Sequence, residues 1–160
     1  MRWGADFEVP YSLAIIGDGD MTYIESLKKK TEGMIAITWH DPVHSEDKWQ
    51  RMTDADVFVL PSFNENYANV VIEALSQGTS VMLSDQVGLK DSVSTNNFGW
   101  VLPCETEQWR LQLRGIWQNP TQLRRIREEA PGAIQRDFNT DKLIRDYQTM
   151  YDEVYAMQSR

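Results

Sequence analysis

The stretch that decides the fold reads DVFVLPSFNENYANVVIEALSQG, from Asp56 to Gly78. Its first part, Asp56–Leu60, is short, rich in β-branched and aromatic residues and stopped by Pro61, which is typical of a strand buried on both faces of a parallel sheet. The residues after Glu65 show helical periodicity, and Gly78 supplies the left-handed residue that commonly ends a helix. The stretch therefore predicts a buried strand that leads directly into an apolar helix.

Two acidic residues, Glu65 and Glu73, lie around the start of this helix. If the residues between them are mostly helical, the two Cα atoms stand roughly 12 Å apart. Carboxyl groups that flank one glycosidic bond need a separation of roughly 5 to 9.5 Å, so this spacing favours two acids that hold opposite ends of an extended ligand. Between them, the helix dipole and the free backbone N–H groups of Asn66 to Asn69 predict an anion site. Taken alone, the pair also fits two solvated acids, since negative charge is favourable near a helix start.

The composition narrows the class of protein. A chain of 160 residues with 41% hydrophobic content predicts one folded domain. The formal charge of −8 and the pI near 4.7 argue against nonspecific binding to nucleic acid or to anionic membranes. A single cysteine, Cys104, favours a reducing, cytoplasmic compartment and a buried, inert thiol. No apolar run has the length of a membrane span.

Strands and helices alternate along most of the chain, which predicts an α/β fold with a parallel sheet, helices on both faces and a ligand at the carboxyl ends of the strands. We expect residues 1–12 to be a leader or an added segment and residues 13–157 to be the domain. The predicted strands are Leu13–Ile16, Met34–Trp39, Val57–Leu60, Ser80–Leu83 and Trp100–Leu102, and the predicted helices before Pro103 are Met21–Thr31, Asp47–Met52 and the one after Glu65.

The chain after Pro103 is predicted to be a helical tail, with helices near Glu105–Trp117, Thr121–Arg136 and Thr140–Met157. Pro131 is expected to interrupt or bend the second of these. We expect the tail to pack back on the sheet. The last helix carries an apolar stripe, which we interpret as core in preference to a partner surface. The stripe consists of Leu143, Ile144, Tyr147, Tyr151 and Val154.

Three further clusters have ordinary interpretations. The GDGD turn from Gly17 to Asp20 lacks the third glycine of a dinucleotide fingerprint, and its two aspartates would repel a pyrophosphate. His40 and His44 flank Pro42, which breaks the helix that would align them, so we expect a loop and no metal site. The Arg124–Arg127 cluster lies in a helical stretch that also contains acids, and it is interpreted as a solvated face.

Taken in order, these segments resemble the carboxyl-terminal, donor-binding half of a GT-B fold retaining glycosyltransferase of family 4. LAIIGDGD resembles the family's strand and glycine turn, ADVFVLPS its strand into the active site, and EALSQGTSVMLSDQVGLKDSV its helix, next strand and donor-side loop. The stretch from Phe138 to Tyr155 resembles its terminal helix. The most specific element is the Glu65 and Glu73 pair directly after a strand that ends in Leu-Pro-Ser.

The resemblance implies a Rossmann-like half of a GT-B fold that binds a nucleotide diphosphate sugar. Glu65, the candidate catalytic residue, would lie against the donor sugar, and Glu73 would bind the ribose hydroxyls. The donor would also meet Asn66, the amides of Tyr67, Ala68 and Asn69, and the turn with Gly17 and Gly19. No cofactor and no metal are expected, because helix termini and basic side chains neutralise the negative charge of the diphosphate in this family.

Two departures from the family pattern are visible. This chain has Tyr67-Ala68 where the family usually has Phe-Gly. The family's diphosphate-binding arginine and lysine lie in an additional strand–helix unit before Leu13, and the amino-terminal acceptor domain is missing. The resemblance therefore implies a fragment or truncated form of a two-domain enzyme that is inactive alone. The alternatives are a noncatalytic Rossmann-like interaction module and, less closely matched, a nucleotide-sugar epimerase.

Overall fold

The computed structural model describes residues 10–158 of the chain. These fall into two compact units, and the boundary between them in the sequence is between Arg51 and Met52. Most of the predicted leader lies outside the described residues, and Pro10 to Ser12 form no helix or strand. Helix α2 (Ser45–Asp54) contains the boundary between the units.

The first unit is a strand–helix–strand unit made of β1 (Leu13–Ile16), α1 (Met21–Lys30) and β2 (Ile37–His40). The two strands are parallel and in register from the Leu13–Ile37 pair to the Ile16–His40 pair. Helix α1 begins after Asp20, whose side chain accepts a hydrogen bond of 2.8 Å from the backbone N–H of Tyr23. The GDGD turn thus ends in an ordinary capping aspartate.

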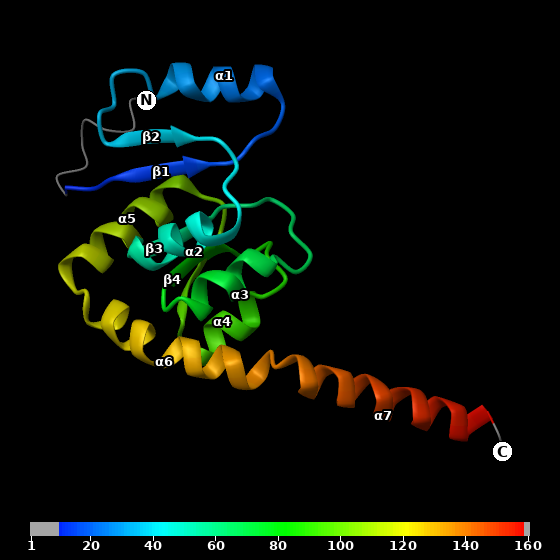
Figure 1. The fold of residues 1–160 in the computed structure, drawn as a ribbon. Helices are drawn as coiled ribbons and strands as arrows, with labels where there is room; N and C mark the ends of the chain where they lie inside the picture. Colours follow the sequence, from blue (N-terminus) through cyan, green and yellow to red (C-terminus); the bar gives the residue numbers. More distant parts are fainter. Residues whose placement is uncertain (1–9, 159–160) are drawn as a thin grey trace. The chain divides into compact units, whose positions relative to one another are not determined.

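The second unit is built on three parallel strands, β3 (Val57–Leu60), β4 (Ser80–Ser84) and β5 (Gly99–Leu102), in the order β3-β4-β5. Figure 1 labels the first two of them. The predicted α/β class with parallel strands and helices on both faces is confirmed. The predicted strands are hydrogen-bonded as two sheets, one in each unit, rather than as one sheet.

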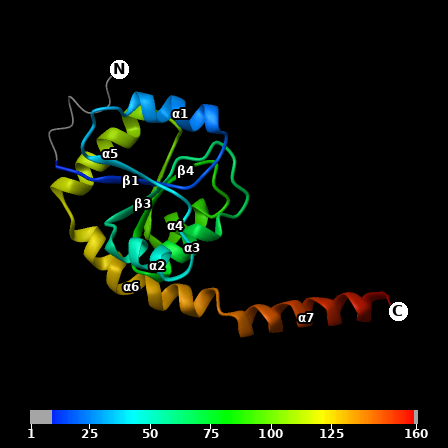
Figure 2. The same ribbon diagram turned by 45° about the horizontal axis from the view of Figure 1, so that its top comes forward.

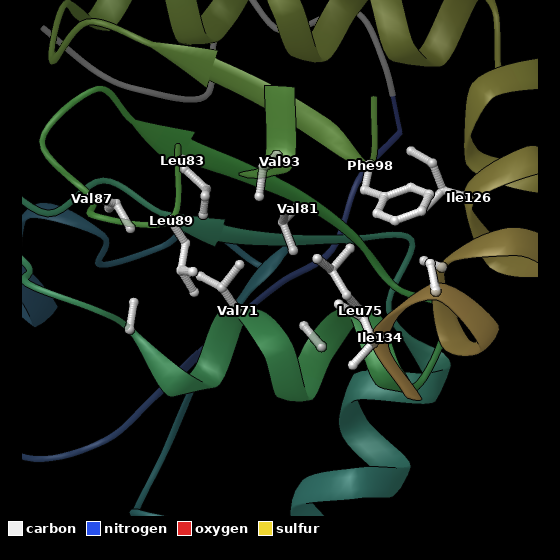
Figure 3. Close-up of a cluster of buried hydrophobic side chains, with 14 of the residues drawn as sticks. Val71, Leu75, Val81, Leu83, Val87, Leu89, Val93, Phe98, Ile126 and Ile134 are labelled. Carbon is white, nitrogen blue, oxygen red and sulfur yellow. The ribbon is translucent and has the colours of Figure 1, made fainter. Parts of the chain in front are cut away.

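The core of the second unit lies on both faces of β4, every residue of which is buried. Val81 and Leu83 point to one face, where Figure 3 shows them packed with side chains of α3 (Asn69–Ser76) and α6 (Thr121–Asp137). Met82 points to the other face and packs against α5 (Thr106–Gln118). Because side chains alternate along a strand, one apolar strand supplies both cores.

Helix α4 (Lys90–Asn96) was not predicted, although it packs on β5 and β4. Its sequence is polar, with only Val93 buried, so it lacks the apolar periodicity by which helices are recognised. It ends at Asn97, which has the left-handed conformation (φ 53°). The other predicted helices and strands are present with shifted ends; β2, for example, begins at Ile37 and not at Met34.

Helix α6 continues through Pro131. Of the predicted interruption or bend, the interruption does not occur. Proline has no N–H group, so the carbonyl of Arg127, four residues earlier, has no helical partner. Gly78 lies against this carbonyl, since a Cβ added there would be 2.8 Å from the Arg127 oxygen. The residue that ends α3 is therefore also the one that lets α6 approach closely.

The arginine cluster on α6 is not simply a solvated face. Ile126 is fully buried in the core. The guanidinium of Arg125 donates to the carbonyl of Asn97, and that of Arg127 donates to the carbonyls of Thr53 and Ala55 at 3.1 Å each. The interpretation as a solvated face is therefore wrong for Ile126, whereas Arg124 and Arg127 are exposed. The sequence pattern did not show which carbonyls the guanidinium groups reach.

Helix α7 (Thr140–Gln158) does not pack back on the sheet, so the prediction that its stripe is core is wrong. Figures 1 and 2 show it running on beyond the end of α6. The side chain of Leu143 lies outside the described part, and the other stripe residues are 47–66% exposed. Amphipathic spacing predicts an apolar face and does not identify what covers it. Among residues 10–158, no helix is both long and hydrophobic enough to span a bilayer.

Candidate functional site

The candidate site lies on two loops that follow neighbouring parallel strands of the second unit. One loop, residues 61–68, follows β3, and the other, residues 85–89, follows β4. The loops pair with each other: the backbone N–H of Glu65 donates to the carbonyl of Gln86 at 3.3 Å, and the N–H of Gly88 donates to the carbonyl of Glu65 at 2.9 Å. The backbone of Glu65 is thus held from both sides by the second loop.

Gly88 allows this pairing, because a Cβ at that position would overlap the carbonyl oxygen of Asn66. The overlap is with backbone, which no side-chain rotation relieves. Sequence reasoning did not select Gly88, although a glycine soon after a buried strand is a recognised sign of close backbone approach. The side-chain hydroxyl of Ser84 also bonds the carbonyl of Ser62, which ties the starts of the two loops together.

Helix α3 begins at Asn69, later than the sequence indicated. Ala68 precedes it in the left-handed conformation (φ 59°, ψ 65°) and is only 7% exposed. Residues 66–68 are therefore not helical, and the spacing of 12 Å calculated for a helical path between Glu65 and Glu73 does not apply. The glycine that the family usually has at this position fits the observed conformation, since left-handed backbone is costly for residues with a Cβ.

The amino end of α3 has no side-chain cap. In the described part of the chain, the backbone N–H groups of Tyr67, Ala68 and Asn69 have no hydrogen-bond acceptor. This differs from α1, whose amino end is occupied by the Asp20 carboxylate. Unpaired N–H groups at a helix amino end, with the positive end of the helix dipole, are suited to bind an anion.

The remaining predicted residues of this segment lie before and within α3. Glu65 is half-buried before it, and Glu73 is half-buried on the second turn of α3. Asn66 and Asn69 are exposed, and Tyr67 is 51% exposed. Six of the eight predicted site residues thus lie in one continuous segment of the sequence. Gly17 and Gly19 belong to the first unit, and their part in a shared site stays a prediction.

Cys104 lies close to the same loop and is exposed, so the prediction of a buried thiol is wrong. Its Sγ is 3.8 Å from the carbonyl oxygen of Ser62. The residue follows β5 and Pro103, at the edge of the sheet where the strands end. Cys104 is exposed because it lies just beyond the end of a strand, although cysteine side chains are usually buried.

A separate shallow hollow of about 780 Å³ lies at the opposite, amino-terminal end of β3. Arg127 lines it, with its guanidinium already bonded to the carbonyls of Thr53 and Ala55. The hollow contains none of the predicted site residues, and ligands of parallel α/β sheets bind at the other end of the strands. Among the described residues, no three His, Cys, Asp or Glu side chains are grouped as metal ligands.

The left-handed conformation of Ala68 makes a testable prediction. We expect Ala68→Val to lower the free energy of unfolding by about 2 kcal/mol or more, because β-branched residues are outliers at positive φ. Ala68→Gly should stay within about 1 kcal/mol of the wild type, since relief of backbone strain offsets the lost methyl group and the added chain entropy. Urea unfolding followed by circular dichroism measures both changes.

Ala156→Val is the matched control for this substitution, because Ala156 is an exposed residue of α7. It should cost less than about 1 kcal/mol, the difference in helix propensity. If Ala68→Val were as stable as Ala68→Gly, the left-handed assignment at this position would be incorrect.

The chain is similar to known proteins in sequence and in fold. The family described as glycosyl transferases group 1 matches residues 7–132. A sulfoquinovosyl transferase of Arabidopsis thaliana is 34% identical over 87 residues, which are 54% of this chain and 16% of the relative. A D-inositol 3-phosphate glycosyltransferase of Rhodococcus erythropolis is 29% identical over 97 residues, 58% of this chain and 22% of the relative. The chain thus spans less than a quarter of the length of either relative.

Solved structures show the same fold. The sucrose-phosphate synthase of Thermosynechococcus elongatus superposes with a TM-score of 0.76 and 23% identity, over 91% of this chain and 39% of that one. This likeness supports the GT-B type of fold, as the resemblance implied. With the family match over most of the sequence, it leads to one conclusion: the chain belongs to the glycosyl transferases group 1 family.

Proposed function

We propose that this chain is the carboxyl-terminal, donor-binding domain of a retaining, family 4 glycosyltransferase that uses a nucleotide diphosphate sugar. The observation that carries the proposal is the uncapped amino end of α3, which lies between Glu65 and Glu73 in the sequence of a group 1 glycosyl transferase. Such a donor has an anionic diphosphate between two groups that carry hydroxyls, the ribose and the transferred sugar. An anion site at a helix end with an acidic residue on either side of it in the sequence suits this ligand.

Each part of the segment has a role in this proposal. The diphosphate would accept hydrogen bonds from the amides of Tyr67, Ala68 and Asn69, which have no acceptor among the described residues. The carboxylate of Glu73 would accept hydrogen bonds from the ribose hydroxyls, and that of Glu65 would lie against the donor sugar. Charge-assisted bonds of this kind are the stronger ones in proteins. No metal or cofactor is required, because the helix end supplies the positive potential.

Transfer to an acceptor would require the amino-terminal half of a GT-B enzyme, so we expect this chain alone to bind a donor and not to turn it over. The two curated relatives carry different names, a sulfoquinovosyl transferase and a D-inositol 3-phosphate glycosyltransferase. We therefore propose the class of donor and leave the acceptor as any glycan, lipid or small molecule. We also propose a cytoplasmic location, since a single cysteine, Cys104, favours a reducing compartment.

Calorimetric titration with UDP, GDP and ADP, and with their sugar conjugates, tests the proposal. We expect one nucleotide to bind and Glu73→Gln to weaken it by about 10- to 100-fold, the value of one or two hydrogen bonds to a charged acceptor. Glu65→Gln should leave nucleotide diphosphate binding within about threefold and weaken binding of the sugar conjugate by a similar 10-fold or more.

Glu128→Gln serves as the control, because it removes one exposed negative charge from α6 without touching the segment 61–78. It should leave every affinity unchanged within about twofold. Binding of no nucleotide by the wild-type chain, or equal affinities for wild type and Glu73→Gln, would contradict the proposal.

A second candidate function is a noncatalytic interaction module, and the exposed stripe on α7 favours it. Ile144, Tyr147, Tyr151 and Val154 share one side of the helix and are all exposed. A module of this kind would bind another protein through α7 and no nucleotide through α3. The same titrations separate the two functions, since only the donor-binding domain responds to substitution of Glu73.

A further inference from the structure

Lys90 is the only lysine or arginine between Met52 and Trp109. This part of the chain contains all three strands of the second unit and the loops at the carboxyl ends of β3 and β4. It also contains Glu65, Glu73 and Asp85, so its acidic groups outnumber its cations. If the second unit binds a diphosphate at these strand ends, Lys90 is the basic side chain of this part of the chain that can neutralise its charge.

The ammonium group of Lys90 is held at the candidate site. Its Nζ donates a hydrogen bond of 2.7 Å to the carbonyl of Asp85, the first residue after β4, and the side chain is half-buried. The backbone of Asp85 is itself fixed, since its N–H donates to the carbonyl of Leu102 at 2.9 Å. The side chain of Lys90 therefore lies along the loop 85–89 and places its ammonium group near the carboxyl end of β4.

The same loop connects Lys90 to Glu65. The residue after Asp85, Gln86, accepts the hydrogen bond from the Glu65 N–H at 3.3 Å. Because consecutive carbonyl groups are only a few ångströms apart, Lys90 Nζ lies within about 12 Å of the Glu65 amide. A lysine has four flexible methylene groups, so its ammonium can leave a backbone carbonyl for a phosphate oxygen without movement of the backbone.

We propose that Lys90 binds the diphosphate of the donor, as the cation that complements the uncapped end of α3. The inference rests on the proposed function, and it names a residue beyond those of the segment 65–73. The exchange is favourable because an ammonium–phosphate hydrogen bond is charged on both sides, whereas the ammonium–carbonyl bond to Asp85 is charged on one side only. The half-buried position reduces screening of the pair by water.

The test compares nucleoside diphosphate with the unphosphorylated nucleoside, both titrated into wild type, Lys90→Met and Lys90→Arg, by calorimetry and NMR. Lys90→Met should weaken the diphosphate by about 10-fold or more and change the nucleoside by less than about twofold. Lys90→Arg should recover most of the diphosphate affinity, because it keeps the charge. The affinity of the wild type for the diphosphate should fall more steeply with added salt than that of Lys90→Met.

Arg136→Gln is the matched control for net charge, since it removes one exposed positive charge from α6 and should leave both affinities unchanged. Thermal unfolding of Lys90→Met shows whether the variant is folded. If Lys90→Met weakened nucleoside and diphosphate equally, the lysine would have only a structural role, and the inference would be overturned.

Two further outcomes separate this inference from the proposed function. If the wild type binds the diphosphate and Lys90→Met binds it equally well, only the assignment of Lys90 fails. If the wild type binds no nucleotide at all, the donor-binding proposal fails and the role of Lys90 fails with it.

Discussion

Replacement of Gly88 by alanine is expected to lower the free energy of unfolding of the second unit by about 3 kcal/mol. A Cβ at this position would overlap the carbonyl oxygen of Asn66, so the two loops at the strand ends would have to separate. Separation breaks the bonds that join Glu65 to Gln86 and Gly88. Urea unfolding measures the stability change, and we expect nucleotide diphosphate affinity to fall by more than 10-fold, because the end of α3 is displaced.

Gly115→Ala is the control for this substitution. Gly115 is a glycine of α5 around which a Cβ would meet no atom within 4 Å. Alanine there should raise the free energy of unfolding by about 0.5 to 1 kcal/mol, as expected for a helix interior. A Gly88→Ala variant with wild-type stability and wild-type nucleotide affinity would show that the two loops are not packed in this way.

Leu83→Ala is expected to destabilise the second unit by about 3 to 4 kcal/mol. Leu83 is completely buried on β4, in the core between the sheet and α3 (Figure 3). The cost combines the lost transfer free energy of the side chain with the cavity that it leaves. Because Ser84 and the loop after it follow directly, the variant should also show faster hydrogen exchange of the Glu65 and Gly88 amides.

The control for the core substitution is Leu111→Ala, since Leu111 is 52% exposed on α5. We expect it to cost less than about 1 kcal/mol. Equal destabilisation by the two leucine substitutions, measured by the same urea titration, would contradict the placement of Leu83 at the centre of the core.

The order of elements in the second unit, apart from α4, was predictable because it depends on local patterns. The apolar run of Val57–Leu60 predicted β3, and helical spacing with a final glycine predicted α3. The position of Glu65 and Glu73 around the start of that helix drew attention to them, and the family resemblance supplied their expected roles. The family match confirms the kind of protein, whereas the roles of the two glutamates stay predictions.

The exact geometry of the site was not predictable in the same way. The start of α3 at Asn69 is fixed by hydrogen bonds between Glu65 and a loop about 20 residues later, and no local pattern contains that pairing. Gly88 and Lys90 were missed for the same reason, since their importance comes from the backbone atoms they approach. The apolar stripe of α7 shows the converse case, a clear local pattern whose surroundings the sequence did not reveal.

Apart from α4 and the exact start of α3, the sequence by itself determined where the strands and helices lie, because side-chain periodicity and turn residues act over a few neighbouring positions. Only the tertiary structure decided how the two strand-end loops meet, which leaves the amino end of α3 uncapped beside Glu65. The physical reason is that a backbone hydrogen bond or a close approach between remote segments depends on how the sheet brings them together. For this protein, the chemical groups of the candidate site were therefore visible in the sequence, and their arrangement was not.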